Sequence, residues 1–268
     1  MTYMILLLLA VVPAVALMIV IYMCDRIEKE PIGLVLGVMG LGMLSCIPTI
    51  ICEMIADPIL GFVFGFNEWI HNFMSAFLGV ALIEEFWKLV MVRLLVWNRK
   101  AFNYRFDAIV YCVASSLGFA LVENIMYVLQ NGFSTGIVRA IIPVPGHCTF
   151  AIFMGYFFGN AKLFEVKGQI GKSWLWLFYS LLFPTLQHGF FDFCLFMEKT
   201  WLVLVFLAFV LACDVIAIVR IARSEKLDTP FYALKQGDTW ISNPDWMQMA
   251  ATSMNVQMPN IKYDMTKK

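Results

Sequence analysis

Residues 74–96 read MSAFLGVALIEEFWKLVMVRLLV, and this run of 23 residues decides the fold. A helix of roughly 20 mostly apolar residues is long enough to cross the hydrocarbon core of a bilayer. The run nevertheless carries Glu84, Glu85 and Lys88 near its middle. Each charged side chain at the centre of a membrane helix costs about 2.5–3.5 kcal/mol. The sequence therefore predicts a membrane helix whose charged groups face protein or water rather than lipid.

The composition of the whole chain agrees with a membrane protein. Of its 268 residues, 61% are hydrophobic and 14% are charged. Soluble domains are typically about 45–50% apolar and about 25% charged, and a soluble globule of this size could not hide the excess from water. Lysine plus arginine and aspartate plus glutamate both number 19, so the net charge gives no indication of a nucleic acid partner. The seven cysteines form no C-x-x-C pair and are interpreted as small apolar residues.

Seven stretches are long and apolar enough to be spanning helices. They are Tyr3–Cys24, Ile32–Ile55, Met74–Val96, Asp107–Leu129, Ile141–Phe164, Ser173–Phe196 and Trp201–Ile221. The segment Gly61–Trp69 is apolar but too short to span, and we expect it in the membrane interface. Pro143 and Pro145 should break or bend the start of the fifth span. The sequence thus predicts an all-α polytopic bundle of about seven spans.

Loop charges predict the orientation of these spans, because basic residues favour the cytoplasmic side. The loops after the first, third, fifth and seventh spans are basic, whereas the alternate loops hold no basic residue, Arg139 alone and Lys199 alone. This alternation predicts an external N-terminus and a cytoplasmic C-terminus. Residues 1–221 are predicted to form the transmembrane domain. Residues 222–268 are polar and lack periodicity, which predicts a partly disordered cytoplasmic tail.

Ionisable residues in four of the predicted spans share helix faces and depth. Residues four apart lie on one face of a helix, which pairs Glu84 with Lys88, Phe119 with Glu123, and His188 with Asp192. With His147 near the start of the fifth span, these groups reach the outer half or the midplane of the predicted bundle. A membrane protein does not need such groups to fold, so the pattern predicts a shared polar site.

Five motifs that occur in order resemble the PrsW family of intramembrane proteases, which is related to CAAX-processing and bacteriocin-processing membrane proteases. They are DRIEKEP at Asp25–Pro31, EEFWK at Glu84–Lys88 (E-E-x-x-K), FALVEN at Phe119–Asn124 (F-x-x-x-E-N) with Asp107 and Tyr111 upstream, PGH at Pro145–His147 with Gly155 and Tyr156 after it, and HGFFD at His188–Asp192 (H-x-x-x-D). Together they cover residues 25–195. The resemblance implies a multi-pass protein of the cell membrane that cleaves a membrane-anchored substrate, such as an anti-sigma factor cut first on its extracytoplasmic side.

Peptide hydrolysis needs an activated water, an oxyanion stabiliser and a proton donor for the leaving amine. Glu84 or Glu85 is predicted to be the general base. The other predicted catalytic and supporting residues are Glu123, His147, His188, Lys88, Phe119, Asn124 and Asp192. Two chemistries stay open: a glutamate-dependent enzyme without a cofactor, which we favour because H-E-x-x-H is absent, and a zinc enzyme that would use His147, His188 and Glu123.

Other kinds of protein also place acids and histidines in membranes. A proton-coupled transporter uses such chains as proton relays, although the inverted repeats and paired broken helices of many transporters are not evident in the sequence. A non-catalytic scaffold or receptor is a third class. In a purely structural interpretation, Glu84 and Lys88 form a buried ion pair that fixes helix register, and His188 and Asp192 join two helices.

Overall fold

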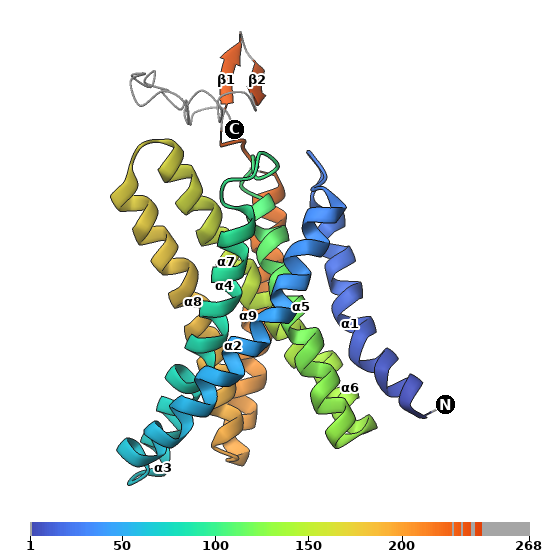
Figure 1. Ribbon diagram of the computed structural model, residues 1–268, viewed down its shortest axis with the longest axis vertical. Coiled ribbons are helices and arrows are strands. Elements are labelled where there is room, and N and C mark those ends of the chain that lie inside the picture. The colour runs from blue at the N-terminus through green and yellow to red at the C-terminus, as the bar shows by residue number, and fades with distance from the viewer. Residues whose placement is uncertain (1, 227, 232, 237–238, 243–268) are drawn as a thin grey trace. The chain divides into compact units, whose positions relative to one another are not determined.

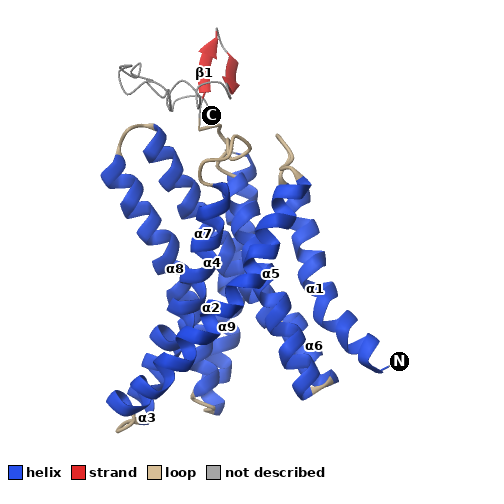
Figure 2. Cartoon of the chain, in the orientation of Figure 1, coloured by secondary structure: helices blue, strands red, loops and turns tan. Residues whose placement is uncertain are grey.

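The computed structural model describes residues 2–226, 228–231, 233–236 and 239–242. Helices dominate the first compact unit, residues 1–231. In chain order they are α1 (Thr2–Cys24), α2 (Ile32–Phe64), α3 (Glu68–Met74), the π-helix η1 (Ser75–Ala81), α4 (Leu82–Val96), α5 (Asp107–Asn131), α6 (Phe133–Ile141), α7 (Pro143–Val166), α8 (Ile170–Phe196) and α9 (Thr200–Lys226). Figure 1 follows this order by colour, and Figure 2 separates helix from loop. Within the second unit, the antiparallel strands β1 (Ala233–Gln236) and β2 (Thr239–Ser242) pair with each other.

Five segments of the described chain meet the length and hydropathy expected of a membrane span. They are Tyr3–Cys24, Ile32–Phe64, Asp107–Asn131, Phe133–Val166 and Thr200–Lys226. The other two predicted spans fall on α8 and on the continuous helical run 68–96. Both runs have spanning length, and both carry the charged and imidazole side chains considered below. The all-α prediction is confirmed, and the count of seven spans stays a prediction.

Three predicted boundaries differ from the structure. Helix α2 continues to Phe64, so Gly61–Trp69 is not a separate segment but the end of α2 and the start of α3. The third predicted span is not one regular α-helix, because η1 interrupts it before α4. Helix α9 runs to Lys226, five residues past Ile221, where the predicted seventh span ends; the domain boundary at residue 221 stays a prediction, and most of the predicted tail lies outside the described residues. The predicted break at the prolines is confirmed, since α6 ends at Ile141 and α7 begins at Pro143.

Helix α5 is the centre of the bundle. Every residue from Phe106 to Leu121 is buried. The helix packs against α1, α2, α4, α6 and α7, which surround it in Figure 1. By contrast, α1 and α9 leave most of their apolar surface exposed, as expected of helices that face lipid. The central helix therefore carries its polar residues where only protein or enclosed water can meet them.

Helices α2 and α5 approach each other closely at two glycines. A β-carbon on Gly42 would lie 2.0 Å from the carbonyl oxygen of Ser115, and one on Gly118 would lie 2.1 Å from that of Met39. Membrane helices use small residues to bring their backbones this close. Any larger residue at either position must push α2 and α5 apart.

We expect Gly118→Ala to lower the thermal unfolding midpoint of the detergent-purified protein by several degrees. Overpacking of a tight contact costs about 1–3 kcal/mol, and each kcal/mol shifts the midpoint of a chain this long by about 2–4 °C. The matched control is Gly40→Ala, because a β-carbon on Gly40 meets nothing within 4 Å. Equal midpoints for the two variants would contradict the close approach.

The loops sort to the two ends of the bundle in the groups that the charge alternation predicts. At one end, Asn103 bonds to Glu28 at 3.0 Å, and the Phe231 N–H donates to the Asn103 carbonyl at 2.7 Å. At the other end, Asn72 donates to the carbonyl of Phe196 at 3.3 Å. Loops expected on the same side of the membrane therefore contact one another. Which end faces the cytoplasm stays a prediction.

Candidate active site

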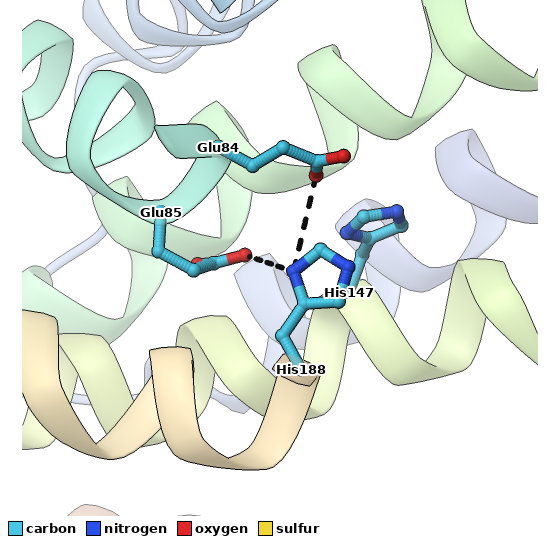
Figure 3. A group of neighbouring side chains, drawn as sticks. All are labelled: Glu84, Glu85, His147 and His188. Atoms are coloured by element: carbon cyan, nitrogen blue, oxygen red, sulfur yellow. Dashed lines mark hydrogen bonds and ion pairs between the residues drawn. The ribbon is translucent and has the colours of Figure 1, made fainter. Parts of the chain in front are cut away.

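Four ionisable side chains from three helices converge inside the bundle. Glu84 and Glu85 come from the first turn of α4, His147 from the first turn of α7, and His188 from the second half of α8 (Figure 3). Each contributes one nitrogen or oxygen atom to a group in which all four atoms lie within 4.8 Å of one another. All four residues are buried. We call Glu84, Glu85, His147 and His188 the central group.

Lys88 supplies the positive charge that compensates the two glutamates. Its Nζ lies 2.8 Å from Glu84 Oε2 and 2.8 Å from Glu85 Oε1, one turn further along α4. The same ammonium is 3.2 Å from His147 Nδ1 and rests 4.2 Å above the centre of the Phe119 ring. Buried carboxylates persist only when they are paired in this way. The E-E-x-x-K spacing therefore places the lysine of α4 on the same face as both glutamates, where its charge balances theirs.

Each histidine lies between two polar partners. His147 Nε2 is 2.9 Å from Glu123 Oε2 on α5, opposite its contact with Lys88. His188 Nδ1 is 3.0 Å from Glu85 Oε1, and its Nε2 is 3.3 Å from Asp192 Oδ2. The ring of Phe150 stacks on His188 with centroids 5.2 Å apart. The result is a continuous polar chain across the bundle, with both imidazole orientations fixed.

The π-helix η1 directly precedes the two glutamates. The N–H of Leu82 donates to the carbonyl of Phe77, five residues earlier. Such wide turns change the face that the following residues present, and they occur frequently at functional sites. On the facing helix, a β-carbon on Gly189 would lie 2.5 Å from the Phe77 ring, so α8 fits closely against η1. This contact brings the neighbouring His188 to the start of α4.

A buried carboxylate beside imidazole and ammonium groups has the components of hydrolytic chemistry. A carboxylate can take a proton from water, and a charged imidazole or ammonium can stabilise an oxyanion or protonate a leaving group. Structural ion pairs have similar components, so the geometry alone does not identify the activity of the chain, and the comparison with known proteins shows its family. A family model described as "PrsW family intramembrane metalloprotease" matches residues 30–219. The chain belongs to the PrsW family of intramembrane proteases.

Curated PrsW proteases resemble this chain over most of its length. The chain is 37% identical to "Protease PrsW" of Geobacillus kaustophilus (strain HTA426) over 193 residues, covering 71% of this chain and 80% of that protein. It is 34% identical to "Protease PrsW" of Oceanobacillus iheyensis over 218 residues, covering 81% and 94%. It is 30% identical to that of Bacillus subtilis (strain 168) over 192 residues, covering 72% and 83%. No solved structure matches the chain. The chain is therefore an intramembrane protease that acts on a membrane protein.

The ionisable residues predicted from the sequence meet in space. Two of the three predicted pairs four residues apart are in direct contact: Lys88 with Glu84, and His188 with Asp192. Asn124 lies away from the central group, where its side chain donates to the carbonyl of Ala10 at 2.9 Å and ties α5 to α1. Its predicted supporting role in catalysis stays a prediction.

Two intramembrane groups that the sequence left outside the site also have partners. His71 is half-buried, and its Nε2 lies 3.5 Å from the Ser75 hydroxyl. Asp214 of α9 accepts a hydrogen bond of 2.7 Å from Thr149. The first contact joins neighbouring turns of one helical run and the second joins α7 to α9, as polar side chains commonly do between membrane helices.

Arg139 contacts two of the predicted site residues, and sequence reasoning did not include it. Its Nη2 lies 3.0 Å from Glu123 Oε2, and its Nε donates to Asn124 Oδ1 at 2.8 Å. Its guanidinium also lies 4.2 Å from the centre of the Tyr127 ring. Arg139 belongs to the short helix α6, which appeared in the sequence only as part of an external loop. Its position eight residues before His147 was the one available signal.

We expect Arg139→Gln to reduce proteolysis by about 10–100-fold, the usual effect of losing a group that orients a site residue. The cause is the loss of the charge that holds Glu123 against His147. Arg139→Lys should restore part of the rate, because it keeps the charge but not the planar fork. Cleavage of an anchored reporter measures both. The control is Arg99→Gln, whose native side chain is exposed and bonds only to the Leu95 carbonyl among the described contacts. A rate for Arg139→Gln equal to that control would remove Arg139 from the site.

The central group also has the donor types of a zinc site. Two imidazole nitrogens and two carboxylate oxygens within 4.8 Å match in kind and number the ligands that zinc takes. The predicted zinc set of His147, His188 and Glu123 is not the one that converges, because Glu123 stands behind His147 as its hydrogen-bond partner. A second oxygen of Glu85 is buried with no hydrogen-bond partner among the described residues. By donor type and spacing, Glu84, Glu85, His147 and His188 fit a metal, while Lys88 contacts three of them.

Proposed function

We propose that this PrsW protease hydrolyses a peptide bond of a membrane-anchored protein with a water activated by Glu84, without a metal. The observation that carries the proposal is the Lys88 ammonium at 2.8 Å from both glutamates and 3.2 Å from His147 Nδ1. An ammonium at this point already balances the negative charge of Glu84 and Glu85, so a metal ion is not needed to balance it.

Glu84 is better suited than Glu85 to be the general base. The Glu84 side chain is 7% exposed, whereas that of Glu85 is 0% exposed. Glu85 is also held by both Lys88 and His188 Nδ1. A general base must reach the water whose proton it takes. Glu85 therefore acts as a positioning residue that fixes His188, while Glu84 holds the water.

His188 is the proposed proton donor to the leaving amine. It lies between Glu85 and Asp192, so both of its nitrogens can carry protons, and its Nδ1 is 3.9 Å from Glu84 Oε2. Glu84 removes one proton from water as the new C–O bond forms at the substrate carbonyl. The C–N bond then breaks, and the amine nitrogen takes a proton from the imidazole. The positive charge of Lys88 stabilises the negative charge on the carbonyl oxygen, and His147, whose Nδ1 accepts from the Lys88 ammonium, holds that ammonium in place.

A metalloprotease mechanism is the second candidate, because the matching family model carries that description. Glu84, Glu85, His147 and His188 would hold the ion. A bound zinc would polarise the substrate carbonyl and lower the pKa of a water. The Lys88 amine would then have to give up its contacts with the glutamates and His147. Loss of proteolysis on chelation, restored by zinc, would favour this candidate over the first.

The loop charges support an orientation for the chain, and membership of the PrsW family supports a class of substrate. We propose a multi-pass protein of the cell membrane with an external N-terminus and a cytoplasmic C-terminus. In this orientation the central group lies in the outer half of the bilayer or at its midplane, where it could cut the external juxtamembrane segment of a single-span protein. An anti-sigma factor is a substrate of this type. The grouping of loops at the two ends supports the predicted alternation of loops between the two sides of the membrane. It does not say which end faces the cytoplasm.

The test uses the full chain reconstituted into liposomes with a single-span reporter that carries distinct tags on its two sides. Mass spectrometry of the products gives the cleaved bond. We expect cleavage on the reporter's external side, without loss of rate in a zinc chelator. Cleavage on the cytoplasmic side would reverse the proposed orientation. Solute uptake with no cleavage of any anchored reporter would contradict the proposed activity.

A further inference from the structure

A second group of acids lies outside the central group, at the end of the bundle that holds the loop between α1 and α2. Asp25 directly follows α1, Glu30 lies two residues before the start of α2, and Asp107 is the first residue of α5. One carboxylate oxygen from each lies within 4.8 Å of the other two. The three residues are 2%, 2% and 0% exposed, respectively. We call them the acid triad. The proposed proteolytic mechanism assigns them no role.

Two oxygens of the triad are buried without a partner. Asp25 Oδ2 and Asp107 Oδ1 have no hydrogen-bond donor among the described residues. The other oxygen of Asp107 accepts from the backbone N–H groups of Asn103 and Tyr104 at 2.9 and 2.6 Å. The Tyr111 hydroxyl donates to Glu30. A buried carboxylate oxygen without a donor is unfavourable unless a proton or a cation meets it.

No basic side chain of the described residues pairs with the triad. The nearby ammonium of Lys29 instead donates to backbone carbonyls, at 2.7 Å from that of Tyr22 and 3.2 Å from that of Met23, and also to that of Asp25. Three buried carboxyl groups thus share one site without an ion pair to a basic side chain among the described residues.

We propose that the acid triad binds a hard divalent cation, Mg²⁺ or Ca²⁺. All three ligands are oxygens, which these cations prefer, and the triad contains none of the imidazole or thiolate ligands typical of zinc. The cation would join the end of α1, the start of α2 and the start of α5. Helix α5 carries Phe119 and Glu123 of the proteolytic site, so bound cation would stiffen the helix that supports it. The proposal does not depend on how the central group works.

The test is the thermal unfolding midpoint of the full chain in detergent, after chelation and then with increasing Mg²⁺ or Ca²⁺ at pH 7.5. A ligand at about 100 times its Kd stabilises the folded state enough to raise the midpoint of a chain this long by about 5–10 °C. We expect this rise for wild type and for Glu84→Gln, and its loss in Asp25→Asn. The matched control is Glu28→Gln, in the same loop but exposed, which should keep the rise.

A second measurement keeps the test informative if Asp25→Asn fails to fold. Binding of Mn²⁺, a hard cation with a paramagnetic signal, is followed on wild type and Asp25→Asn by electron paramagnetic resonance. We expect about one tightly bound Mn²⁺ per wild-type chain, displaced by excess Mg²⁺ or Ca²⁺. Absence of both the midpoint rise and bound Mn²⁺ in wild type would overturn the proposal. A rise in midpoint on acidification alone would likewise overturn it and would indicate that the triad holds a proton instead.

Discussion

Glu84→Gln should reduce cleavage of an anchored substrate by at least about 10³-fold, within the range that general acid–base groups contribute. The amide keeps an oxygen for the 2.8 Å hydrogen bond from Lys88 but cannot take a proton from water. The unfolding midpoint should therefore change little while the rate falls. Single-turnover cleavage in liposomes measures the effect without product release.

Two variants make the Glu84 experiment specific. Glu85→Gln should lose less, about 10–100-fold, because Glu85 orients His188 and does not meet water. Glu68→Gln is the matched control, since Glu68 lies on the same helical run, is 60% exposed and only touches Lys199 at 3.4 Å. It should cleave at the wild-type rate. If Glu85→Gln were the inactive variant and Glu84→Gln active, the two roles would be exchanged.

The convergence of the site could be predicted from spacing within single helices. Lys88 is one turn from Glu84, and Asp192 is one turn from His188, so each pair had to share a face. The cost of these groups in lipid then required the faces to meet one another. Both expectations needed only local geometry and one energetic argument, which is why they survive comparison with the structure.

Other features depended on contacts that no local pattern encodes. The π-helix η1 has an ordinary apolar sequence, and its wide turn fits the packing of Phe77 against Gly189. Arg139 reaches Glu123 because α6 folds back beside α5, and a lone basic residue in a loop does not predict that. The zinc set considered from residue types included Glu123 rather than Glu84 and Glu85, because residue type does not say which acids lie nearest to both histidines. The sequence gives the chemical type of each residue, but it does not give the tertiary contacts that decide which residues meet.

Lys88→Met should both destabilise the protein and abolish proteolysis. Lys88 is completely buried, and its loss leaves two carboxylates of the central group without their counter-charge. Removing one partner of a buried ion pair typically costs about 3–5 kcal/mol, or roughly 10 °C in the unfolding midpoint of a chain this long. The rate should fall at least about 100-fold, because Glu84 and His147 lose the group that aligns them. Thermal unfolding in detergent and reporter cleavage measure the two effects.

The Lys88 variant also separates the two mechanisms. Lys199→Met is its control, because Lys199 is 42% exposed and its contact with Glu68 is 3.4 Å, so its loss should cost almost nothing. In the metal-free mechanism, zinc added to Lys88→Met does not restore cleavage, because the ammonium is the group that stabilises the oxyanion. If zinc restored both the midpoint and the rate, the two glutamates and two histidines would be metal ligands. Lys88 would then serve only to neutralise the site before the ion binds.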